Sequence, residues 1–341
     1  MRRVNLAVVL LISALLSCDD DKYEYRYFPD KPENMAEFNS EYDDYNSYLD
    51  IIGDSGPFCF SSNRNSLGNN YNIINKTLSV YMEKTPGRVT LIVSDYYAGY
   101  REANQIPGNL SDAMMRINTQ SNELGPFLVP QGEGIFERYN PLPDYNRYIV
   151  LYATDESGNL EIQFTENVTE DYYCTQQKVR FCNSSSDDAY PSIMADTSSI
   201  YFCSDREGSF DIYSVDISGT GRFLDLLYDT LEREIRKVSE LCSEYDDKCP
   251  FIAGNLLVFT SDRPGGYGGF DLYYSLYNGS TWSSPVNFGK KINSAYDEYR
   301  PFVKNLGRDF KNDFMIFSSN RPGGKGGYDL YYVGINKMTG I

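Results

Sequence analysis

The side chains of this chain that could do chemistry are mainly carboxylates, tyrosines and thiols. Its 341 residues include 48 Asp and Glu, 31 Tyr and 7 Cys, but no His. Without His, neither a Ser-His-Asp or Cys-His nucleophile, nor a His general base, nor a His-ligated zinc site can be built. Paired carboxylates remain, and they can catalyse glycoside hydrolysis without His. We expect neither a metal ion nor a cofactor.

The charge of the chain restricts its partners. Lys and Arg total 31 against 48 acids, which gives a net charge of -17. An acidic surface repels phosphate backbones, so we expect no nucleic-acid partner. A protein or a glycan remains as the expected partner, and we expect the chain to be a monomer.

The N-terminal segment predicts export. Arg2 and Arg3 precede an apolar run over 6–16, which is too short to span a bilayer but is typical of a signal peptide. The tetrad Leu15-Leu16-Ser17-Cys18 resembles the lipobox of bacterial lipoproteins. That resemblance implies a signal peptide over 1–17, a lipid-bearing Cys18 and a tether over 18–24.

The three acids Asp19, Asp20 and Asp21 follow Cys18 directly and resemble two different sorting signals of lipoproteins. One retains a lipoprotein at the inner membrane, and the other sends it to the cell surface. The sequence therefore places the protein in the bacterial cell envelope, with the outer membrane favoured, and leaves open whether it faces the surface or the periplasm.

The remaining cysteines do not define a disulfide framework. Cys174 with Cys182, or Cys242 with Cys249, would each close a short loop in an oxidising compartment. Spacing alone does not decide between paired and free thiols. Cys59 and Cys203 lie within apolar strand patterns, which favours buried, unpaired side chains.

An internal repeat organises the chain. Its first element begins with an apolar residue, which is usually followed by Asn-Ser or a related pair and then by acids. In four of the five copies a Pro lies nine residues after the apolar residue. The five copies start near residues 38, 117, 182, 241 and 292. A second element follows each copy: an apolar run, a Ser-Asn or Ser-Asp pair, usually Arg, a turn, an aromatic residue and an acid. The fullest example is FSSNRPGGKGGYDLYYV from Phe317.

Each repeat predicts four short strands, because alternating apolar residues flank turns rich in Gly. Repeats of this kind are typical of β-propeller blades. The fold class is therefore all-β, a propeller of four-stranded blades, with five blades favoured. A sixth, degenerate blade hidden in 76–116 is the alternative.

The order of the elements predicts how the ring closes. The last repeat ends about five residues before the C-terminus and lacks an outer strand. Residues 25–37 can supply that strand and so remove an open sheet edge. We therefore expect one propeller domain over 25–341, closed by an N-terminal strand that completes the last blade.

At these residues the chain resembles the WD-like Pro-Asp repeats of bacterial envelope proteins, a group that includes the TolB-like propellers. FSSNRPGGKGGYDLYY is the most specific part of the resemblance, which covers about 38–341. It departs from the TolB-like pattern in having five motifs where that family has six. The resemblance implies a propeller in the envelope.

Residues that recur in every blade are expected to serve the scaffold. The acids Asp44, Glu123, Asp188, Asp247 and Glu298 recur in all five repeats, and Arg64, Arg206, Arg263 and Arg321 in four. We expect them to pair within or between blades. Glu156 replaces the Arg of the second repeat. The Gly-rich stretches lack the Lys-Ser/Thr ending of a phosphate-binding loop and are expected to be turns.

The segments that break the repeat are the candidate functional regions. The insert over 96–116 carries Tyr96, Tyr97, Tyr100 and Arg101, residue types that are enriched at binding hot spots. A second segment, 222–238, has apolar residues at four-residue steps, which predicts an amphipathic helix.

Two functional hypotheses follow. The first is a non-enzymatic binding or scaffold lipoprotein, with the tyrosine insert as its contact surface and no catalytic residues. The alternative is a carbohydrate-active enzyme that uses carboxylates. The first is favoured because Asp50 is the only acid within the stretches expected to form the innermost strands, YLDII, PFLVP, PSIMA, PFIAG and PFVKN.

Overall fold

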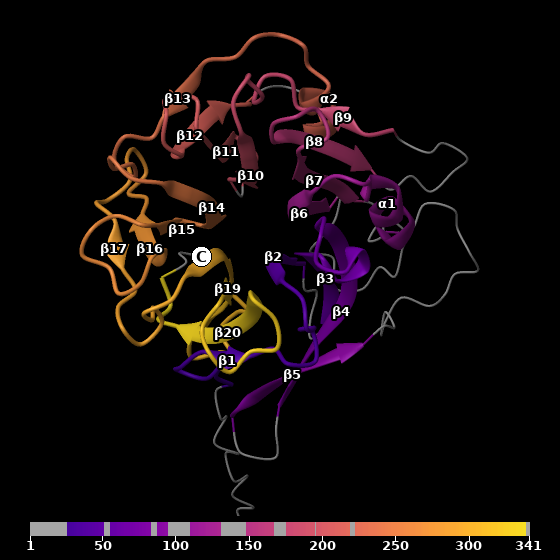
Figure 1. The fold of residues 1–341 in the computed structure, drawn as a ribbon. Coiled ribbons are helices and arrows are strands. Elements are labelled where there is room, and N and C mark those ends of the chain that lie inside the picture. Colours follow the sequence, from indigo (N-terminus) through magenta and orange to yellow (C-terminus); the bar gives the residue numbers. More distant parts are fainter. Residues whose placement is uncertain are drawn as a thin grey trace, which may run out of the picture.

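The fold was analysed in a computed structural model, which describes residues 26–50, 55–82, 87–94, 110–130, 148–166, 175–194, 196–218 and 222–338. In this part of the chain the strands form five separate four-stranded antiparallel sheets. The sheets stand around a central axis like the blades of a fan (Figure 1). The chain is therefore a five-bladed β-propeller, as the repeat predicts.

Each blade uses consecutive strands, except that the last blade takes its outer strand from the N-terminus. The first two blades consist of β2 (Asp44–Leu49), β3 (Ser55–Ser62), β4 (Asn72–Met82) and β5 (Val89–Ser94), then β6 (Glu123–Pro130), β7 (Tyr148–Thr154), β8 (Glu161–Glu166) and β9 (Gln177–Lys178). The third and fourth consist of β10 (Asp188–Ile193), β11 (Ser199–Ser204), β12 (Asp211–Asp216) and β13 (Ile235–Lys237), then β14 (Asp247–Ala253), β15 (Leu256–Ser261), β16 (Asp271–Leu276) and β17 (Val286–Asn287). The fifth consists of β18 (Glu298–Lys304), β19 (Asp313–Ser319), β20 (Asp329–Ile335) and β1 (Glu33–Asn34).

The innermost strands β2, β6, β10, β14 and β18 contact one another in sequence, and β18 contacts β2, which closes the ring. The stretch that was the candidate for a sixth blade instead supplies the outer half of the first blade: 72–82 forms β4 and 89–94 forms β5. The five-bladed prediction is therefore confirmed.

The N-terminal segment closes the last blade as predicted. Glu33 pairs with Tyr332 and Asn34 with Tyr331, so β1 lies antiparallel to β20. Phe28, just before β1, is buried against the rings of Phe310 and Phe314, with centroids 5.4 and 4.4 Å away. The edge of the last blade is thus covered by paired backbone and by an aromatic contact.

The core lies between the blades and consists of side chains from both faces of the sheets. The middle strands carry the largest apolar runs, and β7 and β19 are buried along their whole length. These two strands read YIVLYAT and DFMIFSS, which is the continuous apolar pattern expected of a strand buried on both faces.

Every innermost strand carries an irregularity at the same place. The pairing register shifts between the first and second strands of all five blades. The residue at the shift has a positive φ in each blade, namely Asn46, Gly125, Tyr190, Cys249 and Arg300. Such a bulge bends a strand and redirects its side chains, and here it does so at one level along the propeller axis.

Three secondary predictions need correction or refinement. The segment 222–238 is not one helix. It forms the short helix α2 (Phe223–Leu227) and then the outer strand β13, so only the first part of the four-residue apolar pattern is helical. Within the insert 96–116, the described part begins α1 (Leu110–Ile117), which contacts β4 and β8. The Gly runs are turns, but only Gly265 and Gly323 in them have a positive φ.

The remaining glycines of those turns are needed for close approach. A Cβ on Gly327 would lie 2.3 Å from Oδ1 of Asp43, and one on Gly269 would lie 2.4 Å from Oδ1 of Asp297. The turns therefore press directly against carboxylates of the next blade. No helix among the described residues is long and apolar enough to cross a membrane.

Candidate functional site

The recurring buried acids hold each blade together, as expected from their recurrence. In each blade the acid that begins the innermost strand accepts hydrogen bonds from the backbone N–H and hydroxyl of a Ser or Thr four residues earlier. In four blades an Arg completes the set, for example Arg206 at 2.6 Å from Asp188 and Arg321 at 2.7 Å from Glu298. The four acids with an Arg are neutralised and all five are buried, which excludes them as exposed catalytic groups.

The second blade departs from this pattern. Glu123 accepts hydrogen bonds from Thr119 and Asn72 but has no Arg partner among the described residues, and Glu156, at the Arg place of this repeat, is exposed. Burial raises the pKa of Glu123 above its ordinary value. The departure thus leaves a buried carboxyl group without a cation.

A second recurring group links each blade to the next. The residue before each buried acid accepts a hydrogen bond from the backbone N–H at the start of the third strand of the preceding blade. These linking residues are Asp43, Asn122, Asp187, Asp246 and Asp297. Because Asn122 serves in one blade, the link needs an oxygen acceptor but not a negative charge.

The residues that donate these links surround the axis at the end of the propeller where the innermost strands begin. In chain order they are Tyr71, Leu160, Phe210, Phe270 and Tyr328, and all are partly exposed. Between them, Tyr45 contacts Tyr71 and Tyr328, with centroids 4.8 and 5.9 Å apart. This end of the axis is thus an aromatic-rich surface, which we call the mouth.

One part of the mouth combines aromatic hydroxyl groups with carboxylates. The Tyr71 hydroxyl donates to Oδ2 of Asp43 at 2.7 Å, and the Tyr328 hydroxyl donates to Oδ2 of Asp297 at 3.0 Å. The backbone N–H of Tyr328 donates to Oδ1 of Asp43 at 2.8 Å, so Tyr328 contacts both carboxylates. Neither carboxylate takes part in an ion pair within the described structure. The other blades have Leu160, Phe210 and Phe270 in the tyrosine place and lack this arrangement.

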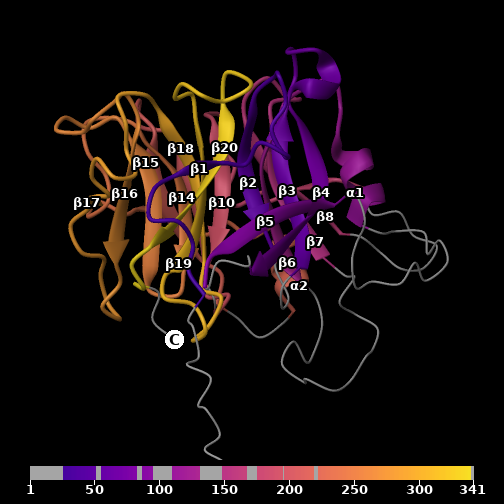
Figure 2. The same ribbon diagram turned by 90° about the horizontal axis from the view of Figure 1, so that it is seen from below.

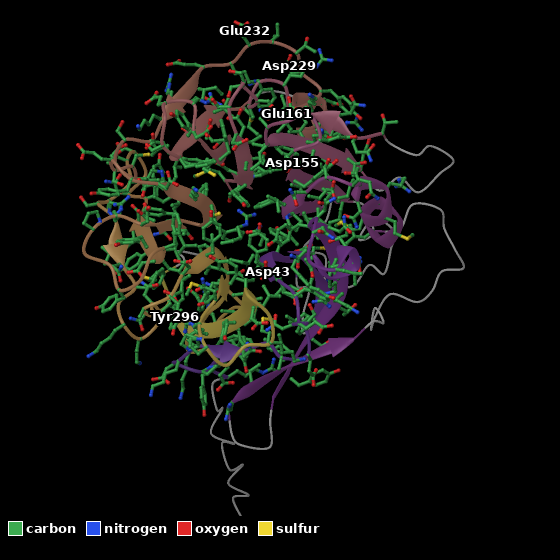
Figure 3. The ribbon with its side chains drawn as sticks, in the orientation of Figure 1. Asp43, Asp155, Glu161, Asp229, Glu232 and Tyr296 are labelled. Carbon is green, nitrogen blue, oxygen red and sulfur yellow. The ribbon has the colours of Figure 1, made fainter. Side chains whose placement is uncertain are left out.

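We call this part of the mouth the tyrosine sector, and it comprises Asp43, Tyr45, Tyr71, Asp297, Tyr299 and Tyr328. Burial raises the pKa of both Tyr71 and Tyr328, and the carboxylates beside them add to the effect. Both phenols therefore stay protonated at neutral pH and act as hydrogen-bond donors. Asp43 lies toward the centre of the ring, whereas Asp229 and Glu232 lie at its outer edge (Figure 3).

The opposite side of the mouth has a different character. The Lys248 ammonium lies 4.2 Å from the Phe210 ring centroid and 5.3 Å from that of Phe270, and it pairs with Asp246 at 2.8 Å. Here the carboxylate is neutralised by a cation. Unpaired carboxylates and phenol groups are thus brought together on the tyrosine sector and not on the Lys248 side.

The axis is closed a short way below the mouth. Four aromatic side chains from different blades contact one another across it, with Tyr48 and Phe127 4.6 Å apart and Phe251 and Phe302 4.8 Å apart. Tyr48 also lies 5.4 Å from Phe302. The axis is therefore filled by packed aromatic side chains at this level. Figure 2 shows the propeller from the side.

The residues singled out from the sequence are not among those of the tyrosine sector. Tyr96, Tyr97, Tyr100 and Arg101 fall outside the described residues, as does Cys18, so their roles stay predictions. Asp50 lies at the other end of β2, buried, 3.7 Å from Lys304. Cys59, Cys182, Cys203, Cys242 and Cys249 are unpaired thiols. The described residues include no cluster of three His, Cys, Asp or Glu able to hold a metal ion.

The sequence analysis missed the tyrosine sector because it treated the recurring acids as a single class. The useful signal was a break in the repeat: Tyr occupies the place after the turn only in the first and fifth blades. These two blades are adjacent once the ring closes, so the two tyrosines and Asp43 meet across the junction between the ends of the chain.

Comparison with solved structures finds similarity to several bacterial proteins. An endo-arabinase from Bacteroides thetaiotaomicron is 13% identical, with 87% of this chain and 95% of that chain covered and a TM-score of 0.48. A protein described as a TolB from Agrobacterium tumefaciens is also 13% identical, with 83% and 74% covered and a TM-score of 0.36. A family 117 glycoside hydrolase from Zobellia galactanivorans is 10% identical, with 92% and 91% covered and a TM-score of 0.44. No family model and no curated protein matches the chain.

This finding corrects the functional prediction. The sequence favoured a non-enzymatic binding or scaffold protein, whereas the propellers found are mostly glycoside hydrolases. This finding counts against the main hypothesis and against its statement that the chain is not an enzyme, and it favours the carbohydrate-active alternative, which is taken up below. At these identities and TM-scores the similarity does not establish an activity, so an activity has to be argued from the residues of this chain.

Proposed function

We propose that this protein is a carbohydrate-active enzyme that binds a glycan at the tyrosine sector and cleaves it with carboxylates. The observation that carries the proposal is the contact of Tyr328 with both Asp43 and Asp297 in an aromatic, partly exposed mouth. Glycosidases without His use a pair of carboxyl groups on either side of the scissile bond. Asp43 and Asp297 supply such a pair on adjacent blades.

Substrate binding follows from the aromatic side chains. Tyr45 and Tyr71 present rings at 66° to each other, and Tyr299 lies 6.5 Å from Tyr45. Aromatic rings with hydroxyl groups offer an apolar face and a polar tip to the same ligand, which suits the apolar faces and hydroxyl groups of a sugar. The net charge of -17 disfavours an acidic polysaccharide, so we propose a neutral glycan.

The reaction needs one proton donor and one proton acceptor. In its acid form, one carboxyl group gives a proton to the glycosidic oxygen as the bond to the anomeric carbon breaks. The other, as a carboxylate, takes a proton from the water that attacks that carbon. The hydroxyl groups of Tyr71 and Tyr328 orient the two side chains, and their raised pKa values keep them from competing as acids.

The location is proposed on separate grounds. The signal-like segment over 1–17 and Cys18 in its lipobox-like setting support a lipoprotein of the bacterial envelope, tethered through 18–24. The resemblance of the repeats to TolB-like propellers supports the same compartment. We propose the outer membrane as the site of attachment.

The test is the cleavage of neutral polysaccharides and oligosaccharides by Asp43→Asn and Asp297→Asn variants. The natural Asn122 shows that an amide can make the link between blades, so these variants are expected to fold. We expect the release of reducing ends to fall by about 10²-fold or more, the usual range for loss of an acid or base. Tyr71→Phe and Tyr328→Phe are expected to have smaller effects.

The matched control is Asp187→Asn, since Asp187 accepts the same link from the backbone N–H of Leu160, and leucine there replaces the tyrosine of the tyrosine sector. We expect it to retain activity and to unfold at the same temperature as the two test variants. Equal activity in Asp43→Asn and Asp187→Asn, or no cleavage of any neutral glycan by the unmodified protein, would contradict the proposal.

A further inference from the structure

The axis of the propeller contains a buried cation. Arg300 projects from the bulge of β18 and has no exposed surface. Its guanidinium group lies over the Tyr190 ring, 5.3 Å from the centroid, and Nη2 lies 3.4 Å from the carbonyl oxygen of Gly125. The side chain of the fifth blade thus reaches across the axis to the second and third blades.

This guanidinium group lacks the partners that a buried charge requires. Nε and Nη1 have no hydrogen-bond partner, and no carboxylate of the described structure lies within ion-pair distance. The arginines that recur in the repeat differ in this respect, since Arg206 and Arg321 each bind a buried acid. An isolated buried charge costs several kcal/mol or more, which is why such charges are normally paired.

The groups around Arg300 cannot supply the missing negative charge. Burial raises the pKa values of Tyr48, Tyr190 and Cys249 well above their ordinary values and also raises that of Cys203, so all four are neutral at pH 7. Burial lowers the pKa of the Arg300 guanidinium group, which expresses the same cost, but an arginine side chain stays protonated in proteins.

A second unsatisfied side chain occupies the same level of the axis. Asn46 has the equivalent bulge position on β2, the strand next to β18, and it is fully buried. Among the described residues neither Oδ1 nor Nδ2 of Asn46 has a partner at normal hydrogen-bond distance, although the Asn46 side chain lies beside the Tyr45 hydroxyl group and the Asn46 backbone N–H donates to Ser318. Buried polar atoms without partners are rare in native proteins, so two such side chains at one level of the axis, one of them a cation, indicate an occupant.

We propose that the propeller axis holds a small monovalent anion of the halide class, bound by the Nε and Nη1 groups of Arg300 with Asn46 as a further donor. The size of the occupant is limited by the packing. A Cβ on Gly125 would already lie 2.5 Å from the Tyr190 ring, and the layer of Tyr48, Phe127, Phe251 and Phe302 closes the axis beside the site. The anion would neutralise the axis and hold three blades together, independently of any activity at the mouth.

The experiment measures the dependence of stability on chloride. The protein is unfolded in urea, refolded without halide, and melted in sodium chloride or in sodium gluconate, whose anion is too large for the site, at equal ionic strength. Because an anion that binds the folded state raises its stability, we expect the midpoint to rise by about 3 °C or more between roughly 1 and 100 mM chloride. Equal midpoints in chloride and gluconate would overturn the proposal.

The variants assign the effect to the axis. Arg300→Met removes the cation while keeping an unbranched side chain, and it is expected to abolish the difference between chloride and gluconate. Arg308→Met removes the same charge from an exposed position, and this variant is expected to keep the difference between chloride and gluconate. A chloride effect that persists in Arg300→Met would overturn the assignment.

A direct measurement covers the case in which Arg300→Met does not fold. Crystals of the unmodified protein refolded in sodium bromide are expected to show a bromide anomalous peak beside Nε and Nη1 of Arg300. Only water at that place would overturn the proposal.

Discussion

Glu123 shows how one departure from the repeat affects stability. It is buried like the other inner-strand acids but lacks the Arg that four of them have. Its pKa is raised by burial. Between its ordinary and its raised pKa, the folded state therefore holds a proton that the unfolded state has released. Stability must then fall as the pH rises through that window.

Replacing Glu123 by Gln removes this ionisation. We expect the variant to be more stable than the unmodified protein at pH 7, by an amount of the order of 1 kcal/mol. The difference is expected to vanish as the pH falls below about 4, near the unfolded pKa of Glu. Urea unfolding between pH 4 and 8 measures both quantities.

The matched control is Asp188→Asn, which removes the same type of acid where an Arg is present. Breaking the pair with Arg206 should destabilise the protein at pH 7 by about 2–4 kcal/mol. A Glu123→Gln variant that is less stable than the unmodified protein at pH 7 would contradict the argument.

At the residue scale, the sequence predicted the scaffold better than the site. The pairing of the recurring acids with Arg is visible as co-occurrence in each repeat, and the structure confirms it in four blades. The tyrosine sector is not visible in this way, because Tyr71 and Tyr328 are separated by almost the whole chain and meet only when the ring closes. The lack of an acidic partner for Arg300 was also not predictable, because the groups around its side chain come from other blades.

At the scale of elements, the N-terminal segment illustrates closure by a short strand. β1 has only two residues, so its backbone pairing contributes little by itself. Phe28 makes the larger contact, since it is buried against Phe310 and Phe314 and both its backbone groups bond to the amide of Asn312. This segment was predicted from the missing strand of the last repeat, whereas its anchoring residue was not.

Phe28→Ala is therefore expected to destabilise the propeller by about 3–5 kcal/mol, the usual cost of removing a buried aromatic ring. Urea unfolding gives the change in free energy. Tyr267→Ala, at an exposed position in a turn, is the control and should change stability by less than about 0.5 kcal/mol. A loss below about 1 kcal/mol for Phe28→Ala would show that the segment does not hold the ring closed.

The helix predicted over 222–238 fails for a reason that belongs to the same scale. Periodic apolar residues stabilise a helix only where they share one apolar surface. Here Ile235 pairs with Val215 in the outer part of the third blade, so the sheet takes the second half of the segment. Pairing with β12 as the fourth strand of the blade thus determines the structure of this part of the segment, and the local helical pattern does not.

At the scale of the whole molecule, the fold was predictable because it repeats. Five copies of each motif gave the number of blades, and the order of strands within a repeat gave the closure. The function was not predictable in the same way, since repeats report what every blade needs. The non-enzymatic hypothesis rested on Asp50 being the only acid in the stretches expected to form the inner strands. The carboxylates of the tyrosine sector, Asp43 and Asp297, lie just before those strands.

The proposed attachment to the membrane makes a separate prediction. Cys18→Ser is expected to move the protein from the membrane fraction to the soluble fraction, because a lipid on Cys18 would be lost. The control is Cys59→Ser, which removes a buried thiol and should leave the distribution unchanged. Retention of Cys18→Ser in the membrane fraction after a high-salt wash would argue against lipid attachment at this residue.

The central claim is that a glycan binds at the tyrosine sector with its scissile bond between Asp43 and Asp297. The most direct measurement is a crystal structure of the Asp43→Asn variant with a neutral oligosaccharide bound. The account predicts a sugar ring against Tyr45 or Tyr71 and a glycosidic oxygen within hydrogen-bonding distance of residue 43 or Asp297. An oligosaccharide bound away from the mouth, with these carboxylates untouched, would contradict it.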